Sequence, residues 1–285
     1  MADGIRALVG QLAAELRAHR IDQALAEAEW LLAGTLGLRR TELYLREAPL
    51  APEDEARVLE LLARRVGGEP LAYLLGSAEF LGHPLRIGPA VFIPRPETEV
   101  LAAEAIAWAT RRTGSLTAFD VCAGSGALAI SLAAAVSSCR VLALELSWEA
   151  LCLAEENVRL NRLEERIGLI RSDLTGGVRG PADLIMSNPP YVPSSALDAM
   201  GPSAPKDPRL SLDGGPDGLT AARRLLDDAP RLLAPGGALC MECAEDQAAV
   251  LAGLARERAW VDTVRIVNDL AGRPRGVMIE RRDSC

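Results

Sequence analysis

The sequence predicts an α/β fold in which a mostly parallel sheet follows a small helical bundle. From residue 94 onward, short apolar runs typical of strands alternate with helical patterns, which is the arrangement of a parallel sheet with crossover helices. Up to about residue 75, apolar residues recur at helical spacing. We therefore expect a helical bundle over residues 1–75, a β-hairpin linker over 76–93 and an α/β domain over 94–285.

The N-terminal part contains three helical patterns, the first marked by Ile5, Leu12 and Leu16. The third is expected to begin at Pro52, because proline suits the first turn of a helix and the acidic residues 53–55 follow it. The bundle carries no cluster of ionisable residues of the catalytic type. We expect it to act as a docking or covering module, the alternative being that it only stabilises the chain.

The linker and the sheet follow in chain order. Residues 79–93 predict a hairpin, because they contain the turn-forming stretches 82–84 and 88–89, and a helix is expected from Pro96 to about residue 112. Strands are expected at residues 116–122, 140–145, 167–171, 183–187, 238–243, 261–267 and 276–281. The last two would close the sheet with an antiparallel strand. Residues 193–216 form a long, proline-rich connection of the kind that often serves as a lid or a substrate wall.

Charge and hydropathy exclude several classes of protein. The net charge of −8, from 31 basic and 39 acidic residues, argues against a wide phosphate-binding surface, so we expect no direct nucleic-acid binding. No apolar stretch is long enough to span a membrane, and the first residues form an amphipathic helix and not a signal sequence. The sequence predicts a soluble cytoplasmic protein, which we expect to be a monomer.

The cysteines include one pair with the spacing of a metal or redox site, Cys240 and Cys243. No second pair accompanies it, and the pair lies in an apolar run that predicts a central strand. Packing in the core is therefore the favoured interpretation, with redox or metal use as the alternative. We expect no metal site.

A turn rich in small residues, Cys122-Ala123-Gly124-Ser125-Gly126, connects the first predicted strand of the sheet to an apolar helix. Glycines let a backbone approach a ligand closely, and the free N–H groups of the helix start face the same space. A glycine turn alone is weak evidence, because many α/β proteins use one only to make a tight connection.

Two acids strengthen the case for a ligand. Glu145 ends the second predicted strand, about 20 residues after the glycines, where a carboxylate can hold ribose hydroxyls. Asp173 follows the third. Open parallel sheets bind ligands along the edge where their strands end. The combination predicts a site for a nucleoside cofactor, although Glu145 as an ordinary surface acid remains an alternative.

The most specific stretch is Asn188-Pro189-Pro190-Tyr191, which follows the fourth predicted strand. The prolines fix the backbone and hold the residue before them extended. The loop thus presents an amide side chain, a carbonyl and an aromatic ring, which suits gripping a planar –NH2 group: two acceptors take its N–H bonds while the ring packs on its face. A structural turn is the alternative for this stretch taken alone.

These features together resemble a class I S-adenosylmethionine-dependent methyltransferase and, more narrowly, the PrmC/HemK family of release factor glutamine methyltransferases. The most particular match is the block at residues 91–99, Val-Phe-Ile-Pro-Arg-Pro-Glu-Thr-Glu, and further blocks lie at 69–76, 212–219 and 269–275. Departures from the family pattern are Cys122 in place of the first glycine, Glu145 in place of aspartate, and Cys243-Ala244.

The resemblance implies a Rossmann-like, seven-stranded methyltransferase sheet. It also implies protein methylation in translation termination: a methyl group passes from S-adenosylmethionine, leaving S-adenosylhomocysteine, to the glutamine of the Gly-Gly-Gln loop of bacterial release factors. Asn188 and Pro189 would accept the two N–H bonds of that amide, and Tyr191, next to Pro190, would pack against it.

The resemblance further assigns the cofactor contacts. Residues 122–126 would pass beneath the methionine portion, Glu145 would hold the ribose, and Asp173 with Leu174 would meet the adenine, with Asn188 close by. Residues that would line the methionine end or the substrate entrance are Phe92, Arg95 and Thr98. An alternative for Arg95 is a salt bridge that holds the hairpin to the core.

Two other functions remain open at the level of sequence. A nucleic-acid methyltransferase acting on adenine N6 or guanine N2 would use the same –NH2 geometry, because a flipped base presents an equivalent group. The acidic charge and the 91–99 block favour the protein substrate. A catalytically inactive cofactor-binding or interaction protein is suggested by Cys122, but the intact 188–191 stretch argues against it.

Overall fold

The computed structural model describes residues 2–45, 50–200 and 205–283. The chain divides into two compact units, Met1–Ser77 and Ala78–Cys285. Within the described residues, no helix combines the length and the apolar character needed to cross a membrane.

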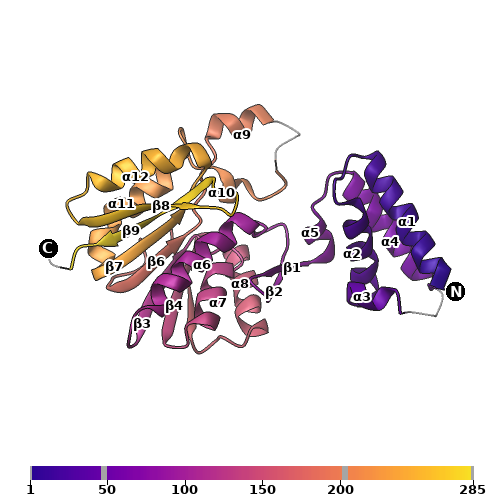
Figure 1. The fold of residues 1–285 in the computed structure, drawn as a ribbon, viewed down its shortest axis with the longest axis horizontal. Helices are drawn as coiled ribbons and strands as arrows, with labels where there is room; N and C mark the ends of the chain where they lie inside the picture. The colour runs from indigo at the N-terminus through magenta and orange to yellow at the C-terminus, as the bar shows by residue number, and fades with distance from the viewer. Residues whose placement is uncertain (1, 46–49, 201–204, 284–285) are drawn as a thin grey trace. The chain divides into compact units, whose positions relative to one another are not determined.

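The described part of the first unit contains helices that pack around a core of their own (Figure 1). Their bounds are α1 (Ala2–Ala18), α2 (Ala24–Leu36), α3 (Arg40–Leu43), α4 (Pro52–Val66) and α5 (Leu71–Leu75). As predicted, α4 begins at Pro52 with acids in its first turn. The short helices α3 and α5 were not expected, because four or five residues are too few to show a helical period. Leu12, Leu16 and Leu31 are fully buried, so the apolar period of α1 and α2 marks this core.

The second unit contains a seven-stranded sheet, which confirms the predicted α/β fold. A small hairpin of β1 (Ser77–Phe80) and β2 (His83–Arg86) comes before it in the chain. The sheet strands are β3 (Leu116–Val121), β4 (Cys139–Glu145), β5 (Ile167–Arg171), β6 (Ala182–Ser187), β7 (Leu233–Glu242), β8 (Val261–Asn268) and β9 (Pro274–Arg281). Their spatial order is β5-β4-β3-β6-β7-β9-β8, and β9 runs antiparallel to both of its neighbours.

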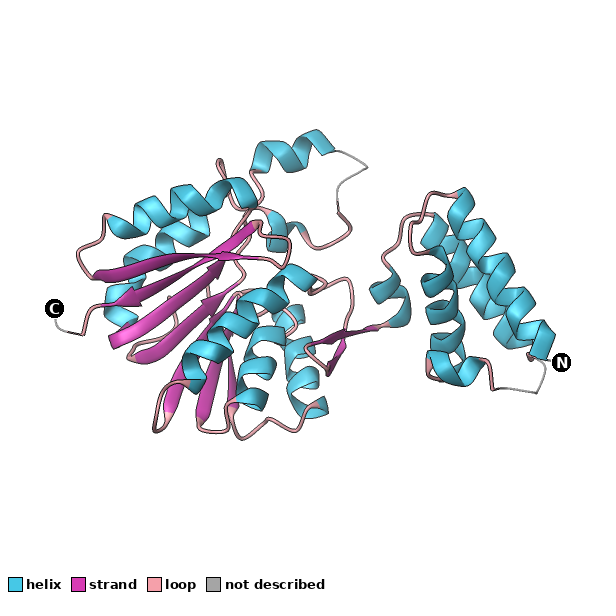
Figure 2. Cartoon of the chain, viewed as in Figure 1, coloured by secondary structure: helices cyan, strands magenta, loops and turns pink. Residues whose placement is uncertain are grey.

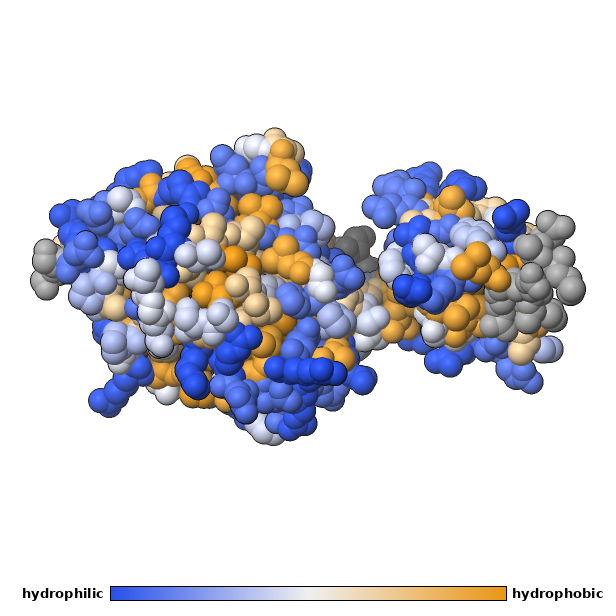
Figure 3. All heavy atoms as spheres, turned by 60° about the horizontal axis from the view of Figure 1, so that its bottom comes forward, coloured by the Kyte–Doolittle hydropathy of each residue, from blue (hydrophilic) through white to orange (hydrophobic). Residues whose placement is uncertain are grey.

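Helices cover both faces of this sheet (Figure 2). On one side lie α6 (Pro96–Thr110), α7 (Ala127–Ala135) and α8 (Trp148–Leu160), and on the other α11 (Thr220–Leu232) and α12 (Ala248–Arg256). Because side chains alternate between the faces of a strand, Phe119 and Val121 of β3 pack with the α11 and α12 layer. On the face shown in Figure 3, hydrophilic residues surround smaller hydrophobic patches, as expected for a chain of ordinary charged content.

The observed strands differ from the predicted ones mainly in β7, which begins five residues earlier than the expected 238–243. Leu233 pairs with Ala182, and the register then shifts before Ala238 pairs with Leu184. The stretch Pro235-Gly236-Gly237 occupies that irregularity, and such residues normally mark the end of a strand. The hairpin likewise ends at Arg86, earlier than the predicted 79–93 span suggests.

The order of the strands in the sheet reverses between β3 and β6. From β3 the chain proceeds outward through β4 to β5, and then returns to add β6 on the other side of β3. Val121, the last residue of β3, pairs with Ser187, the last residue of β6. Loops that leave two such neighbouring strands diverge above the sheet, and the crevice between them is where open α/β sheets bind ligands.

The connection that follows β6 folds back on itself. Its helices are α9 (Ser194–Met200) and α10 (Arg209–Leu212), and residues 201–204 of the predicted lid or wall lie outside the described residues. Backbone hydrogen bonds join Val192 to Leu212 and to Gly214, and Ser194 to Gly215. The 213–219 stretch is thereby held against residues 190–192, the end of the Asn-Pro-Pro-Tyr loop.

Gly218 makes this close packing possible. Its φ is +78°, and a Cβ atom added there would lie 2.2 Å from the carbonyl oxygen of Tyr191. We expect Gly218→Ala to reduce the free energy of unfolding by at least about 2 kcal/mol, from backbone strain and from the overlap with a carbonyl that cannot easily move. Thermal or urea denaturation measures this.

The matched control is Gly253→Ala in the middle of α12, where φ is ordinary and no atom lies within 4 Å of the added Cβ. That substitution should leave stability unchanged or raise it by about 0.5–1 kcal/mol. Equal effects of the two alanines would contradict the close approach at Gly218.

Candidate active site

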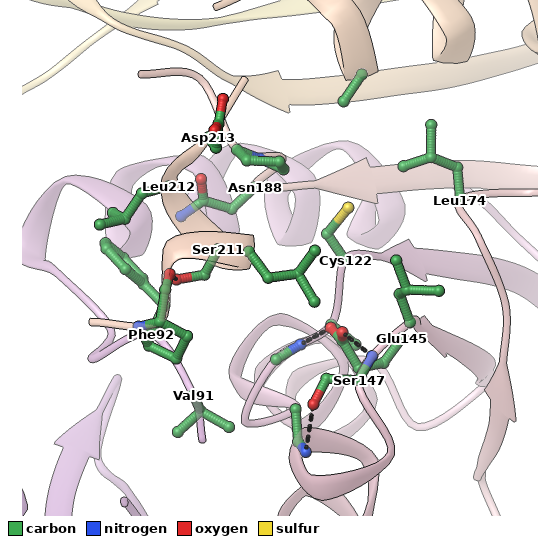
Figure 4. A pocket seen from close by; sticks show the side chains of 18 of the residues that line it. Val91, Phe92, Cys122, Glu145, Ser147, Leu174, Asn188, Ser211, Leu212 and Asp213 are labelled. Atoms are coloured by element: carbon green, nitrogen blue, oxygen red, sulfur yellow. Dashed lines mark hydrogen bonds between the residues drawn. The ribbon is translucent and has the colours of Figure 1, made fainter. Parts of the chain in front are cut away.

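A cavity of about 550 Å³ opens at the carboxyl edge of the sheet, around the point where the strand order reverses (Figure 4). Its volume is in the range of small-molecule sites. It is lined by residues from 90–98, 122–128, 144–150, 172–174, 188–192, 208–215 and 220–224. The loops after β3, β4, β5 and β6 thus meet at one cavity, together with the segment before α6 and the end of the long connection.

The glycine loop after β3 has an unusual backbone. Cys122, Gly124 and Gly126 all have positive φ, at +64°, +53° and +81°. No atom lies within 4 Å of a Cβ built at Gly124, so this part of the loop borders open space. Cys122 adopts a conformation that glycine takes without cost and other residues rarely adopt. Burial raises the pKa of its thiol far above the ordinary range, with a further contribution from Glu145, so the thiol stays protonated.

Glu145 is held in the cavity wall by the backbone on both sides of it. It is buried, and its two carboxylate oxygens accept different backbone N–H groups: Oε2 from Gly124 and Oε1 from Ser147, both at 2.8 Å (Figure 4). Ser147 in turn caps α8, its hydroxyl accepting the N–H of Ala150. Each carboxylate oxygen retains a lone pair for a further donor. The geometry fits a pair of hydroxyl groups arriving from the cavity.

Asp120 lies behind the glycine loop, fully buried in β3. Its Oδ2 accepts the N–H of Ala129 in the first turn of α7, and supplies the acceptor that the N-cap residue Gly126 lacks. Its Oδ1 is buried without a hydrogen-bond partner in the described part of the chain. Burial, with a contribution from the charge of Glu145, raises the pKa of Asp120 to about 7.

Asp173 and Leu174, in the loop after β5, contribute differently to the cavity. Leu174 is buried and lines the cavity, at a positive φ of +48°. Asp173 also lines it but is exposed, and both of its oxygens accept hydrogen bonds from the Arg224 guanidinium, at 3.1 and 3.0 Å. Leu174 therefore offers an apolar surface to a ligand, whereas the negative charge of Asp173 is already paired with the positive charge of Arg224.

The Asn-Pro-Pro-Tyr loop contributes three of its residues to the lining: Asn188, Pro190 and Tyr191. Asn188 donates a hydrogen bond from Nδ2 to the hydroxyl of Thr98, at 3.2 Å. Pro189 is buried behind the lining, and its carbonyl accepts no hydrogen bond from the described residues. The Tyr191 carbonyl, in contrast, accepts one from Gln247 at 2.8 Å.

Tyr191 also makes a polar contact away from the cavity. Its hydroxyl donates to Oε1 of Glu242, the last residue of β7, at 3.3 Å. Burial, followed by the charge of Glu242, raises the pKa of Tyr191, so the ring stays neutral. The ring is consequently held at its far end while it borders the cavity.

The segment before α6, together with the first turn of that helix, supplies the adjoining wall. Phe92 and Thr98 line the cavity, whereas Arg95 is not among its described lining residues. The Arg95 guanidinium stacks over Phe92, 5.0 Å from the ring centroid, and forms an ion pair with the buried Asp207 at 2.8 Å. The N–H of Ile93 also donates to Asp207, at 2.9 Å. Arg95 and Asp207 thus tie this wall to the long connection.

Several lining residues were not predicted. Ser147 could have been predicted from the sequence, because a serine that follows a strand-ending acid and comes just before a helical pattern is a typical helix N-cap. Residues 211–213 belong to the 193–216 connection that was expected to serve as a lid or substrate wall, but they were not named individually. Arg224 lies in α11, and no local pattern marks it as a lining residue. Glu242, which does not line the cavity but contacts Tyr191, was also not predicted, although an acid at the end of an apolar strand run is a visible signal.

Comparison with known proteins identifies the family of this chain. The model of the PrmC N-terminal domain matches residues 7–76, and that of the methyltransferase small domain matches residues 102–200. A release factor glutamine methyltransferase from Moorella thermoacetica is 39% identical over 281 residues, covering 98% of this chain and 99% of the relative. The chain belongs to the release factor glutamine methyltransferase family.

A second member of the release factor glutamine methyltransferases, from Deinococcus radiodurans, is 38% identical and covers 97% of this chain and 98% of the relative. The structure of the T. thermophilus 16S rRNA N2 G1207 methyltransferase (RsmC) in complex with AdoMet and guanosine matches with a TM-score of 0.54 at 20% identity, over 72% of this chain and 50% of that one. This likeness concerns the fold. Family membership confirms the predicted class of enzyme, an S-adenosylmethionine-dependent methyltransferase.

The raised pKa of Asp120 predicts a pH dependence of stability. The group binds its proton more tightly when folded, so its contribution is fully present below its unfolded pKa of 3.8 and is lost as pH rises through about 7. Asp120→Asn keeps an acceptor for Ala129 but cannot titrate. We expect the wild type to lose on the order of 2–3 kcal/mol more stability than this variant between about pH 5 and about pH 8.

Urea denaturation at a series of pH values measures the difference, with Asp262→Asn, an exposed acid on β8, as the control. The control should follow the wild-type curve. Parallel curves for Asp120→Asn and the wild type would show that Asp120 is ionised throughout this range.

Proposed function

We propose that this chain transfers a methyl group from S-adenosylmethionine to the side-chain nitrogen of the glutamine in the Gly-Gly-Gln loop of bacterial release factors. The observation that carries the proposal is the placement of Asn188 in the cavity, with its Nδ2 held by Thr98 and its Oδ1 left for a substrate N–H. The relatives named above supply the identity of the substrate. The reaction would belong to translation termination in the cytoplasm and be carried out by a monomer.

The lining of the cavity suits S-adenosylmethionine. Glu145 would hold the ribose hydroxyls with the lone pairs that its two backbone contacts leave free. The loop 122–126 would pass beneath the methionine portion, where Gly124 borders open space, and Leu174 beside Asp173 would pack against the adenine. When bound, the cofactor supplies an electrophilic methyl group on a sulfonium centre, whose departure leaves a neutral thioether.

The acceptor amide is a weak nucleophile, because the lone pair of its nitrogen is delocalised into its carbonyl. Asn188 Oδ1 and the free Pro189 carbonyl would each accept one N–H bond, orienting that lone pair and stabilising the positive charge that grows on nitrogen. Tyr191 and Pro190 would pack against the planar amide and, with Phe92, exclude water. The nitrogen forms one bond to the methyl carbon as the bond from that carbon to sulfur breaks, and it gives up one proton afterwards, to solvent as the product leaves, so no strong base is needed.

The first unit would dock the release factor. The first unit has a core of its own, and none of its described residues lines the cavity. We therefore assign it no part in the chemistry itself. Holding a large substrate at a second point raises the local concentration of its glutamine at the catalytic unit.

The direct test is the transfer of a tritiated methyl group to purified release factors, with DNA and ribosomal RNA as competing acceptors. Label should enter the release factor only. Transfer to nucleic acid in preference to protein would refute the proposed substrate.

Asn188→Ala should lower the rate of transfer by roughly 100-fold or more, because one of the two acceptors for the substrate N–H bonds is lost. Affinity for S-adenosylmethionine, measured by isothermal titration, should stay within a few fold. Asn268→Ala removes an exposed asparagine at the end of β8 and should change neither quantity. Equal losses of rate and cofactor affinity in Asn188→Ala would contradict the role assigned to the amide.

Removal of residues 1–75 should separate docking from catalysis. We expect kcat/KM for intact release factor to fall roughly tenfold or more, while that for a short glutamine peptide changes little. Circular dichroism and cofactor titration check that the shortened protein is folded. If both substrates lost the same factor, the docking role would be rejected.

A further inference from the structure

Asn157 is a fully buried polar residue in the last turn of α8. It is absent from the described lining of the cavity, yet its side chain forms hydrogen bonds with two other segments, the strand β2 and the glycine loop after β3. A buried amide that cannot reach water needs partners within the protein. The partners of Asn157 therefore show which segments it holds in place.

The Asn157 side chain pairs with the backbone of Arg86 as a neighbouring strand would. Its Oδ1 accepts the N–H of Arg86 at 2.6 Å, and its Nδ2 donates to the carbonyl of the same residue at 3.0 Å. Arg86 ends β2, which belongs to a sheet of only two strands, β1 and β2, among the described residues. Because a side-chain amide carries the same polar groups as a peptide bond, Asn157 completes the hydrogen bonding of this strand edge.

The second hydrogen of Asn157 Nδ2 goes to the glycine loop. It is donated at 2.9 Å to the carbonyl of Ser125, which lines the cavity. The loop also packs closely on α8 at this point, since a Cβ atom built at Gly126 would lie 3.6 Å from the Cβ of Ala154, about one turn before Asn157. One side chain of α8 thus joins the loop at the cavity to the hairpin.

The three contacts fix the orientation of the Asn157 amide. Both of its N–H bonds meet carbonyl oxygens, and its oxygen meets an N–H group. With the amide reversed, all three hydrogen bonds would be lost. A shift of either Ser125 or Arg86 alone would therefore leave a buried polar group unpaired, and such a group is costly.

We propose that Asn157 is a positioning residue of the cofactor site, which fixes the glycine loop and couples the filling of the cavity to the order of the β1–β2 hairpin. A methyl donor bound above the loop would restrain Ser125, and through Asn157 the restraint would reach Arg86. Coupling between two sites is reciprocal, so the hairpin contact in turn tightens cofactor binding. The inference rests on the cofactor class and not on the identity of the methyl acceptor.

The position of the hairpin makes this coupling measurable. None of residues 77–86, all of which the structure describes, lines the cavity. A cofactor in the cavity therefore does not protect the hairpin by direct contact. The hairpin also follows the first unit, which ends at Ser77, directly in the chain. A change in its order concerns the segment that joins the first unit to the catalytic unit.

The first test is calorimetric titration of the full chain with S-adenosylhomocysteine. Asn157→Ala should raise the Kd roughly tenfold or more, because the glycine loop loses the donor that holds Ser125. The matched control is Asn161→Ala at the end of the same helix. Asn161 donates to the Pro84 carbonyl of the hairpin at 2.9 Å and, within the described residues, forms no hydrogen bond with the glycine loop. Its Kd should stay within about threefold of the wild-type value.

A second control separates the positioning of the loop from a general loss of stability. Leu251→Ala in α12 removes a fully buried core side chain that does not line the cavity, and it should lower Tm by roughly 5 °C or more. Its Kd should equal that of the wild type at a temperature where both proteins are folded. A Kd raised as much as in Asn157→Ala would overturn the positioning role, because lost stability alone would explain both.

Hydrogen exchange tests the coupling in the wild-type chain itself. Saturation with S-adenosylhomocysteine should slow the exchange of the backbone amides of residues 77–85 by roughly threefold or more. In Asn157→Ala, saturation with the same ligand should leave the exchange of the hairpin unchanged. Because the wild-type measurement needs no variant, it tests the proposal even if Asn157→Ala does not fold.

Three results would count against the proposal. A folded Asn157→Ala protein with a Kd within threefold of the wild-type value would overturn the positioning role. Hairpin exchange that does not respond to the ligand in the wild type would overturn the coupling, as would exchange that slows equally in Asn157→Ala. If the wild-type chain bound no S-adenosylhomocysteine at all, the cofactor class itself would be wrong, and that result is distinct from any difference among the variants.

Discussion

The parallel pairing of β3 with β6 is the constraint on which the rest of the catalytic unit depends. It sets Val121 beside Ser187 at the edge of the sheet, so the glycine loop and the Asn-Pro-Pro-Tyr loop start from neighbouring points although 66 residues separate them. The Ser187 hydroxyl reinforces the pairing by donating to the Val121 carbonyl at 2.7 Å. Residues of both loops can therefore line the same cavity at this edge of the sheet.

Each of the two loops is backed by one buried acid. Asp120 holds the start of α7 behind the glycine loop, and Glu242 accepts the hydroxyl of Tyr191 behind the Asn-Pro-Pro-Tyr loop. Both acids have pKa values raised to about 7 by burial, and each keeps one oxygen without a partner among the described residues. Burying such groups costs stability, and each acid offsets part of that cost by accepting one hydrogen bond, from Ala129 and from Tyr191 respectively.

The main contribution of the long connection after β6 is to hold the Asn-Pro-Pro-Tyr loop in place. Its glycines at 214 and 218 let the 213–219 stretch approach the carbonyls of Pro190 and Tyr191, and Gln247 fixes the Tyr191 carbonyl from a third direction. Arg95 and Asp207 join the other wall to the same connection. The Asn-Pro-Pro-Tyr loop is therefore braced by backbone contacts with the 213–219 stretch and by the side chain of Gln247.

The sequence by itself determined the fold class, the strands of the sheet apart from the start of β7, the cofactor class and most of the segments that meet at the cavity. It could do so because apolar period, glycine turns and proline-fixed loops are local properties, and strand ends of a parallel sheet share one edge. Only the tertiary structure showed that Asp173 forms an ion pair with Arg224, and that Arg95 forms one with Asp207. It also showed that β7 starts at Leu233, and that Tyr191 donates a hydrogen bond to Glu242. These contacts join side chains about 50 to 110 residues apart, or depend on strand register, and neither is encoded in any short stretch of the chain.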